Sequence, residues 1–283
     1  MAYDGPYYLT MREALVTTSV SVTVLALFFV FVALGWPGSA DSCVTEHSGK
    51  ATNTCYCEAF KLADVGKPGV RQPFNTWSNL YSIGAGAFLA VMVYLNRAHG
   101  LPASRNRMRS TNVYPLLYIG IVIFLGLGSM WFHASLVQWG GVVDNLSMYT
   151  FAVFLWSYTL VRMTNRDWPF YATYPAAIVL FTVLNALGIP GWAIILVLTF
   201  AYFVCEGLIA FTMPYVRSDT FGVGAYYVPA LVSFGAACLV WMFSQTGGPL
   251  CSASATFQWH AVWHWLAGVT AVLLYFYWRG ARA

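Results

Sequence analysis

The sequence predicts an all-α, polytopic integral membrane protein with eight transmembrane helices. Of the 283 residues, 59% are hydrophobic and 8% are charged, whereas a soluble domain carries roughly a quarter charged residues. The apolar residues form continuous runs long enough to cross the hydrocarbon core of a bilayer. They do not alternate with polar residues as the strands of an outer-membrane barrel do. These observations exclude a soluble enzyme, a disordered protein and an outer-membrane barrel.

The apolar runs predict spans at approximately 14–35, 76–95, 113–134, 142–161, 170–188, 191–213, 225–244 and 257–278. The first run also has the basic start and small-residue ending of a signal peptide, but its apolar stretch is longer than a signal-peptide core. We therefore expect a retained helix. Gly188 to Gly191 leaves so short a connection that spans five and six are expected to form a hairpin.

The basic residues predict the orientation of the chain. Ten of the 14 lysines and arginines precede span one or follow spans two, four, six and eight, all on one side of an eight-span alternation. The positive-inside rule makes that side, and with it both termini, cytoplasmic. On the opposite side, four basic and four acidic residues cancel in the long connection 36–74. This connection is therefore not a basic surface that would bind a nucleic acid.

Three parts of the chain follow from this topology. Residues 1–40 carry the first helix, residues 41–74 form an exoplasmic or lumenal loop, and residues 75–283 form the membrane domain. Four cysteines fall on the outer side, where an oxidising compartment favours two disulfides whose pairing the sequence leaves open. These are Cys43, Cys55, Cys57 and Cys251.

Three of the five histidines lie within spans. His260 and His264 stand at i and i+4 on one helical face, a spacing that lets two imidazoles bind one metal ion. Alone, this pair is more typical of interfacial histidines that bond water or backbone carbonyls than of metal ligands. His133, near the end of span three, lies at a similar depth of about 5–12 Å below the outer rim. Three imidazoles at one depth predict a zinc site with one open position.

Two further polar residues are candidates for catalysis. Asp144 follows His133 by eleven residues, and Gly140-Gly141 permits a turn that brings its carboxylate back beside His133. It is expected to act as a general base, the alternatives being a group that orients an imidazole and a helix N-cap. Ser129 is expected to bond a substrate oxygen, or a carbonyl of its own helix.

A polar stripe opens span two, and its members share one helical face. They are Asn75, Ser78, Asn79 and Ser82. Helix packing is the first interpretation, and support of the candidate site is the second. Glu206, in the middle of span six, is either a neutral structural acid or part of a polar cavity that supports the site.

Four segments resemble the signature blocks of alkaline ceramidases. They are residues 75–79 (NTWSN), 126–136 (GLGSMWFHASL), 142–148 (VVDNLSM) and 260–264 (HAVWH). Alkaline ceramidases belong to a superfamily of seven-helix membrane hydrolases that includes adiponectin-type receptors. The resemblance covers about residues 55–280, which makes span one an extra N-terminal helix on a seven-helix core.

The resemblance implies that His133, His260 and His264 bind zinc, that Asp144 activates a water molecule and that Ser129 lies at the site. Two acids of the family are replaced here, by Gln72 and Asn145. Of the acidic cluster that binds calcium in the animal enzymes, only Glu58 is kept. This argues against a bound Ca²⁺ and favours a disulfide from Cys55 or Cys57 as the tether.

Four hypotheses for function remain. A transporter is the fourth and ranks last, because no inverted repeat or broken span is visible. The first is a zinc-dependent amidohydrolase that cleaves the N-acyl bond of ceramide to a sphingoid base and a fatty acid. The second is a zinc-dependent phospholipid esterase, and the third is a lipid-responsive receptor with structural zinc. In each case the site lies near the exoplasmic or lumenal side of a plasma, ER or Golgi membrane.

Overall fold

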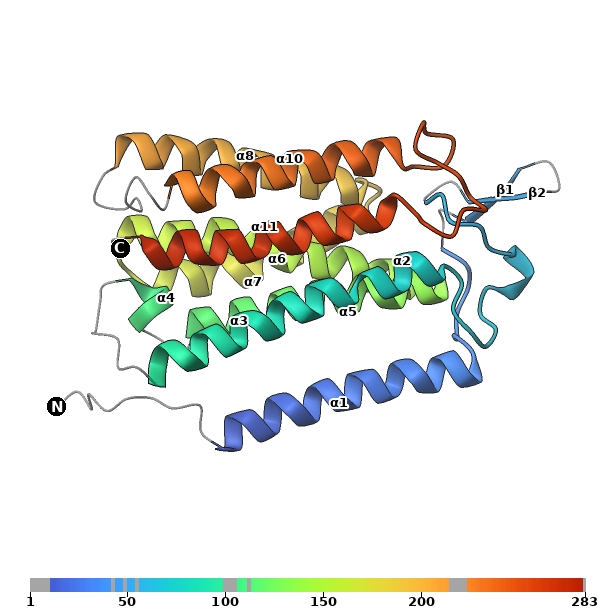
Figure 1. Ribbon diagram of the computed structural model, residues 1–283, viewed down its shortest axis with the longest axis horizontal. Coiled ribbons are helices and arrows are strands. Elements are labelled where there is room, and N and C mark those ends of the chain that lie inside the picture. Colours follow the sequence, from blue (N-terminus) through green and yellow to red (C-terminus); the bar gives the residue numbers. More distant parts are fainter. Residues whose placement is uncertain are drawn as a thin grey trace.

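The computed structural model describes residues 11–41, 44–47, 50–53, 56–98, 106–110, 113–213 and 223–281. Elongated helices run side by side along one axis (Figure 1). The start of α1 (Met11–Leu34) and the end of α11 (His260–Gly280) lie at one end of this bundle. A small hairpin of β1 (Val44–His47) and β2 (Lys50–Asn53) lies at the other end, which we call the outer end.

Among the residues that the structure describes, six helical segments are long and apolar enough to cross a membrane, which confirms the polytopic all-α class. The first comprises α2 (Pro73–Ser78) and α3 (Leu80–Ala98) as far as Leu95. The fifth joins a π-helical turn, Val223–Tyr227, to α10 (Val228–Phe243), and the sixth is α11. The other three are α5 (Val113–Ser135), α7 (Trp168–Ala186) and α8 (Gly191–Thr212).

The two remaining predicted spans lie in the helices α1 and α6. Within the part of α1 whose side chains the structure describes, Val22–Leu34 is a shorter apolar helix. In α6 (Gln138–Thr164), polar residues such as Asp144 and Asn145 in the first two turns lower the mean hydropathy. The helix that carries the candidate catalytic acid is therefore less apolar than its neighbours.

The outer segment between α1 and α2 is fixed against the bundle. The buried rings of Phe28 and Trp36 pack with Trp131 of α5 and hold the end of α1 there. Further along, a disulfide joins Cys57 to Cys251 in the loop between α10 and α11. This is one of the two expected bridges; Cys43 and Cys55 lie outside the described residues. A 3₁₀ turn spans Leu62–Asp64, and α4 (Arg107–Ser110) lies at the opposite end.

The turn between α5 and α6 differs from the expectation. The chain reverses at Leu136, whose φ of 55° is left-handed, and Gly140 and Gly141 already belong to the first turn of α6. The prediction of a turn at this glycine pair was wrong. The glycines serve close packing instead, because a side chain at Gly140 would meet the Ser135 hydroxyl and the backbone of Phe132.

Candidate metal and catalytic centre

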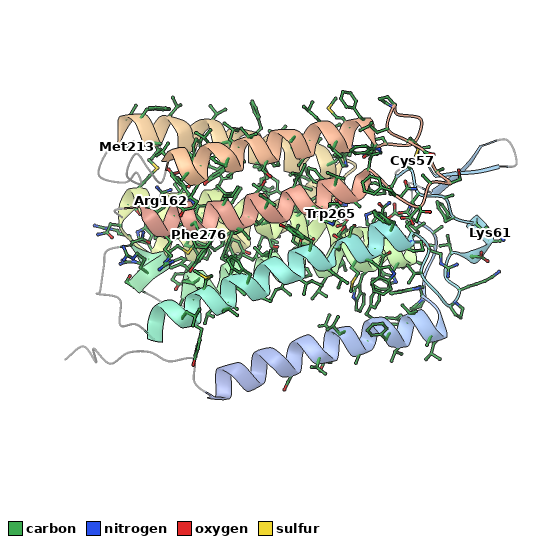
Figure 2. The ribbon with its side chains drawn as sticks, viewed as in Figure 1. Cys57, Lys61, Arg162, Met213, Trp265 and Phe276 are labelled. Carbon is green, nitrogen blue, oxygen red and sulfur yellow. A yellow bond between two sulfur atoms is a disulfide. The ribbon has the colours of Figure 1, made fainter. Side chains whose placement is uncertain are left out.

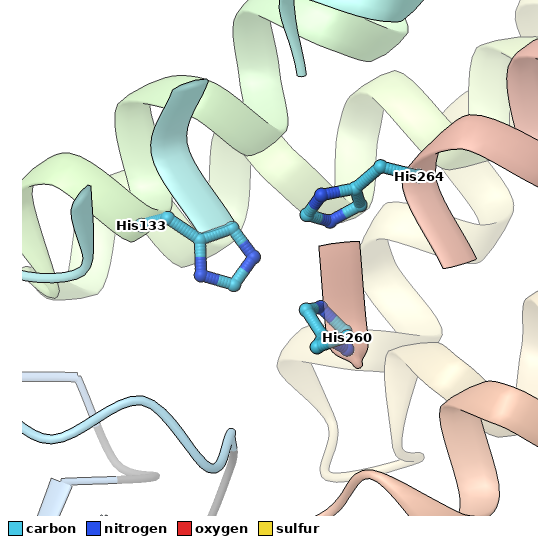
Figure 3. A group of neighbouring side chains, drawn as sticks. All are labelled: His133, His260 and His264. Carbon is cyan, nitrogen blue, oxygen red and sulfur yellow. The ribbon is translucent and has the colours of Figure 1, made fainter. Parts of the chain in front are cut away.

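Three buried histidines meet at the outer end of the bundle. His133 lies in the last turn of α5, while His260 and His264 lie in the first two turns of α11. Each ring offers one nitrogen atom that could bind a metal ion, and these three atoms all lie within 4.8 Å of one another. Figure 3 shows the three rings turned toward a common space. The structure therefore brings together the three histidines that the sequence singled out.

Two of the three histidine rings, those of His133 and His264, are held by hydrogen bonds through Nδ1. Nδ1 of His133 lies 2.7 Å from Oε1 of Gln72, and Nδ1 of His264 lies 2.7 Å from Oγ of Ser78. In both rings, Nε2 is then the nitrogen left for a metal ion. Partners of this kind fix the tautomer and orientation of a metal-binding imidazole.

The third ring, His260, has a buried Nδ1 with no hydrogen-bond partner. A buried nitrogen without a partner costs free energy unless something else binds the ring. Three clustered imidazoles are also the ligand type that transition metals prefer. The donor set therefore fits a metal ion held by His133, His260 and His264.

Ser129 and Asp144 lie next to the histidines. The Ser129 hydroxyl is close enough to the Asp144 carboxylate to interact with it, and its oxygen lies 3.4 Å from Nε2 of His264. Glycines bring their helices close together: a side chain at Gly126 would meet the carbonyl of Asn79, and one at Gly128 would meet Ser147. The close approach of α3, α5 and α6 thus positions both polar groups.

A polar cavity of about 360 Å³ opens beside this group, and Ser129, Asp144 and the three histidines line it. A deeper, apolar cavity of about 50 Å³ shares Ser129, Asp144 and His264 with the first. Its other walls are mostly apolar, from Leu125, Phe151, Phe234 and Ala267 among others. The larger cavity therefore carries the polar groups, and the smaller cavity extends it with an apolar lining.

The outer segment covers the histidines. The ring of Tyr56 lies 4.8 Å from that of His133 and 4.2 Å from that of His260, centroid to centroid. Burial, with smaller contributions from Asp144 and Asp41, raises the pKa of Tyr56, so its phenol stays neutral. Tyr56 directly precedes Cys57, whose disulfide holds it over the site.

Glu58, the acid kept from the calcium cluster, caps a helix. Its two carboxylate oxygens accept hydrogen bonds of 2.8 Å from the backbone N–H groups of Phe74 and Asn75 at the start of α2. Burial raises the pKa of Glu58, and these two hydrogen bonds oppose that shift. Because its backbone carbonyl also accepts from the Gln72 side chain at 3.0 Å, Glu58 helps hold the residue that contacts His133.

The polar stripe predicted at the start of span two lies on α2 and α3 and faces the site. Ser78 contacts His264 directly, and Asn79 and Ser82 line the deeper cavity. Asn75 is buried one turn earlier, and its carbonyl accepts hydrogen bonds from Ser78 and Asn79 at 2.8 Å. The stripe thus contributes polar groups both to helix packing and to the site.

Glu206 lies apart from this group and lines neither cavity. It is fully buried and forms an ion pair with Arg162. It also accepts hydrogen bonds from Tyr277 at 2.8 Å and Thr159 at 3.1 Å. Arg162 lies toward the end of the bundle opposite Cys57 (Figure 2). Glu206 is therefore a structural acid whose main partner is Arg162, and it does not line the cavities of the candidate site.

Sequence reasoning did not assign a role in the site to three residues that contact it: Gln72, Tyr56 and Asp41. Gln72 could have been found, because it lies three residues before Asn75 and extends the polar stripe backward. Tyr56 and Asp41 belong to the outer segment, which has no helical periodicity. Their positions depend on tertiary contacts, and no pattern in the sequence reveals them.

The fold and the site together define a helical membrane protein with a buried three-histidine centre next to a serine and an aspartate. The model of the family described as Ceramidase matches residues 68–282, which is most of the chain. The chain therefore belongs to the ceramidase family and is a ceramidase-like hydrolase. A search of curated proteins finds no match.

Proposed function

We propose that this protein is an intramembrane, zinc-dependent amidohydrolase that cleaves ceramide into a sphingoid base and a free fatty acid. The observation that carries the proposal is the group formed by His133, His260, His264, Asp144 and Ser129 around one cavity. Membership of the ceramidase family supports the amide as the bond that is cleaved. The apolar extension of the cavity supports a substrate that carries an alkyl chain.

The three histidines would hold the metal ion. When bound, zinc supplies a Lewis acid that polarises a carbonyl and makes water acidic near neutral pH. Among the described residues, no fourth histidine, cysteine or carboxylate joins the three-histidine group. Three protein ligands with one open position are typical of catalytic zinc, whereas structural sites are closed by four. This favours an enzyme over a receptor with structural zinc.

The chain's own residues then perform proton transfer and charge stabilisation. Asp144 accepts a proton from the water that attacks the amide carbon, and delivers it to the nitrogen as the C–N bond breaks. The products are a free amine and a carboxylic acid. Ser129, 3.4 Å from Nε2 of His264, donates a hydrogen bond to the carbonyl oxygen as negative charge develops there.

The test is to incubate the purified protein with ceramide and with a phospholipid of the same acyl chain, and to identify the products by mass spectrometry. We expect equal amounts of sphingoid base and fatty acid from ceramide. Activity should disappear when a chelator removes the metal and return when zinc is added.

Two outcomes would contradict this proposal. Fatty acid released from the phospholipid alone would identify the protein as an esterase. Bound zinc with turnover of neither lipid would support the receptor hypothesis.

A further inference from the structure

The segment that follows α1 contributes a carboxylate to the cavity. Residues 36–41 lie across the outer end of α5 and α6, held by hydrogen bonds from Asp41 N–H to the Leu136 carbonyl at 2.9 Å and from Gln138 N–H to the Ser39 carbonyl at 2.9 Å. The Trp139 indole donates to the Pro37 carbonyl at 2.6 Å. These bonds fix the backbone at Asp41, which precedes the family match at residues 68–282.

The side chain of Asp41 lies against the first turn of α6. A side chain at Gly141 would collide with the Asp41 carboxylate, so this glycine leaves the space in which the carboxylate sits. Asp144 follows Gly141 by three residues on the same helical face, and both acids line the polar cavity. Asp41 is close enough to interact electrostatically with Asp144 and with Tyr56.

Apart from the metal ion that the three histidines would hold, the charged side chains in the described lining of this cavity are two carboxylates, Asp41 and Asp144. That part of the lining contains neither a lysine nor an arginine. Phosphate recognition in proteins relies on such cations or on a helix N-terminus. A carboxylate, by contrast, accepts hydrogen bonds from hydroxyl groups and repels a phosphate brought near it.

We propose that Asp41 is a specificity residue that accepts hydrogen bonds from the hydroxyl groups of the lipid headgroup and excludes lipids whose headgroup carries a phosphate. The inference rests on the proposed ceramide hydrolysis. Asp144 acts at the scissile amide, while Asp41, at the outer wall of the same cavity, binds the polar end of the substrate. The extra N-terminal segment thereby narrows the substrate class.

The experiment compares kcat/KM for ceramide with kcat/KM for the same ceramide phosphorylated on its primary hydroxyl. The wild-type protein should prefer ceramide. In Asp41→Asn, the preference should shrink by about tenfold, because a charge-assisted hydrogen bond and a like-charge repulsion are both lost. Most of the loss for ceramide should appear in KM. Asp41→Glu keeps the charge and should keep the discrimination against phosphate.

Asp64→Asn is the matched control. Asp64 lies in the same outer segment but pairs with Lys67 at 3.5 Å and does not line the cavity, so its removal should leave the preference unchanged. The deciding quantity is the ratio of kcat/KM for ceramide to kcat/KM for the phosphorylated ceramide. If Asp41→Asn retains the wild-type ratio, as Asp41→Glu should, the role of Asp41 is overturned. Wild-type protein that cleaves neither lipid would instead contradict the proposed function itself. Zinc content and thermal unfolding of each variant confirm that it is folded.

Discussion

Gln72 and His133 are joined by a hydrogen bond of 2.7 Å between Oε1 and Nδ1, although they are 61 residues apart in the chain. The amide nitrogen of Gln72 bonds the carbonyl of Glu58 at 3.0 Å, which fixes the side chain from its other side. The bond requires Nδ1 of His133 to carry the proton, because Oε1 is an acceptor. This leaves Nε2 as the nitrogen that is available to a metal ion.

Replacing Gln72 should weaken metal binding without abolishing it. Gln72→Leu removes the acceptor and is expected to lower zinc affinity about 10- to 100-fold, the usual effect of losing a group that orients a metal-binding histidine. Competition with a zinc chelator of known affinity measures the change. Gln72→Glu keeps an acceptor and should bind zinc at least as tightly as the wild type. Equal affinity in all three proteins would contradict the role of Gln72.

Ser129→Ala should reduce turnover while zinc stays bound. The loss of one hydrogen-bond donor to a developing negative charge typically lowers kcat by about 10²- to 10³-fold. The measurement is single-turnover release of fatty acid from ceramide, with zinc content determined in parallel. Ser147→Ala is a control, since Ser147 is buried nearby in α6 and bonds the Asp144 backbone carbonyl at 2.7 Å. Equal losses in both variants would mean that the effect arises from packing.

Removing the disulfide should destabilise the outer segment. Cys57→Ser breaks a bridge between residues separated by 194 positions in sequence, and loss of a native disulfide typically costs about 2–5 kcal/mol. We expect a lower unfolding temperature and faster loss of zinc, because Tyr56 is no longer held over His133 and His260. Cys205→Ser and Cys238→Ser replace the two unpaired cysteines of the described chain and should not accelerate zinc loss. A Cys57→Ser protein as stable as the wild type would contradict this account.

Glu206 should matter for stability and not for the metal. Glu206→Gln leaves the buried Arg162 guanidinium without its counter-charge, which is expected to cost about 3–5 kcal/mol. The unfolding temperature should fall clearly, while the folded fraction still binds zinc in the wild-type ratio. Loss of zinc from protein that remains folded would instead place Glu206 in the functional site.

The helices were predictable because burial in a bilayer requires long apolar runs, and those runs are visible in the sequence. The three histidines were predictable for the same reason: ionisable groups within such runs are rare. The position of Asp144 beside the histidines was also predicted, but from a wrong turn, since the chain reverses at Leu136 and not at the glycine pair.

The outer segment was the part that sequence reasoning could not place. Asp41 and Tyr56 reach the cavity through a strand-like contact with Leu136 and through the disulfide at Cys57, which are contacts between distant parts of the chain. Arg162 and Glu206 form the other case. A lone acid within a span predicts a partner, but the pairing of α6 with α8 depends on how the helices pack.

The account is tested most directly by the fate of ceramide in Asp144→Asn at full zinc occupancy. Asparagine has nearly the same shape but cannot accept the proton from water. We predict that the variant binds as much zinc per protein molecule as the wild type. It should release fatty acid about 10²- to 10⁴-fold more slowly, which is the usual contribution of a general base. Wild-type rates of ceramide hydrolysis by this variant, with zinc bound, would contradict the central claim.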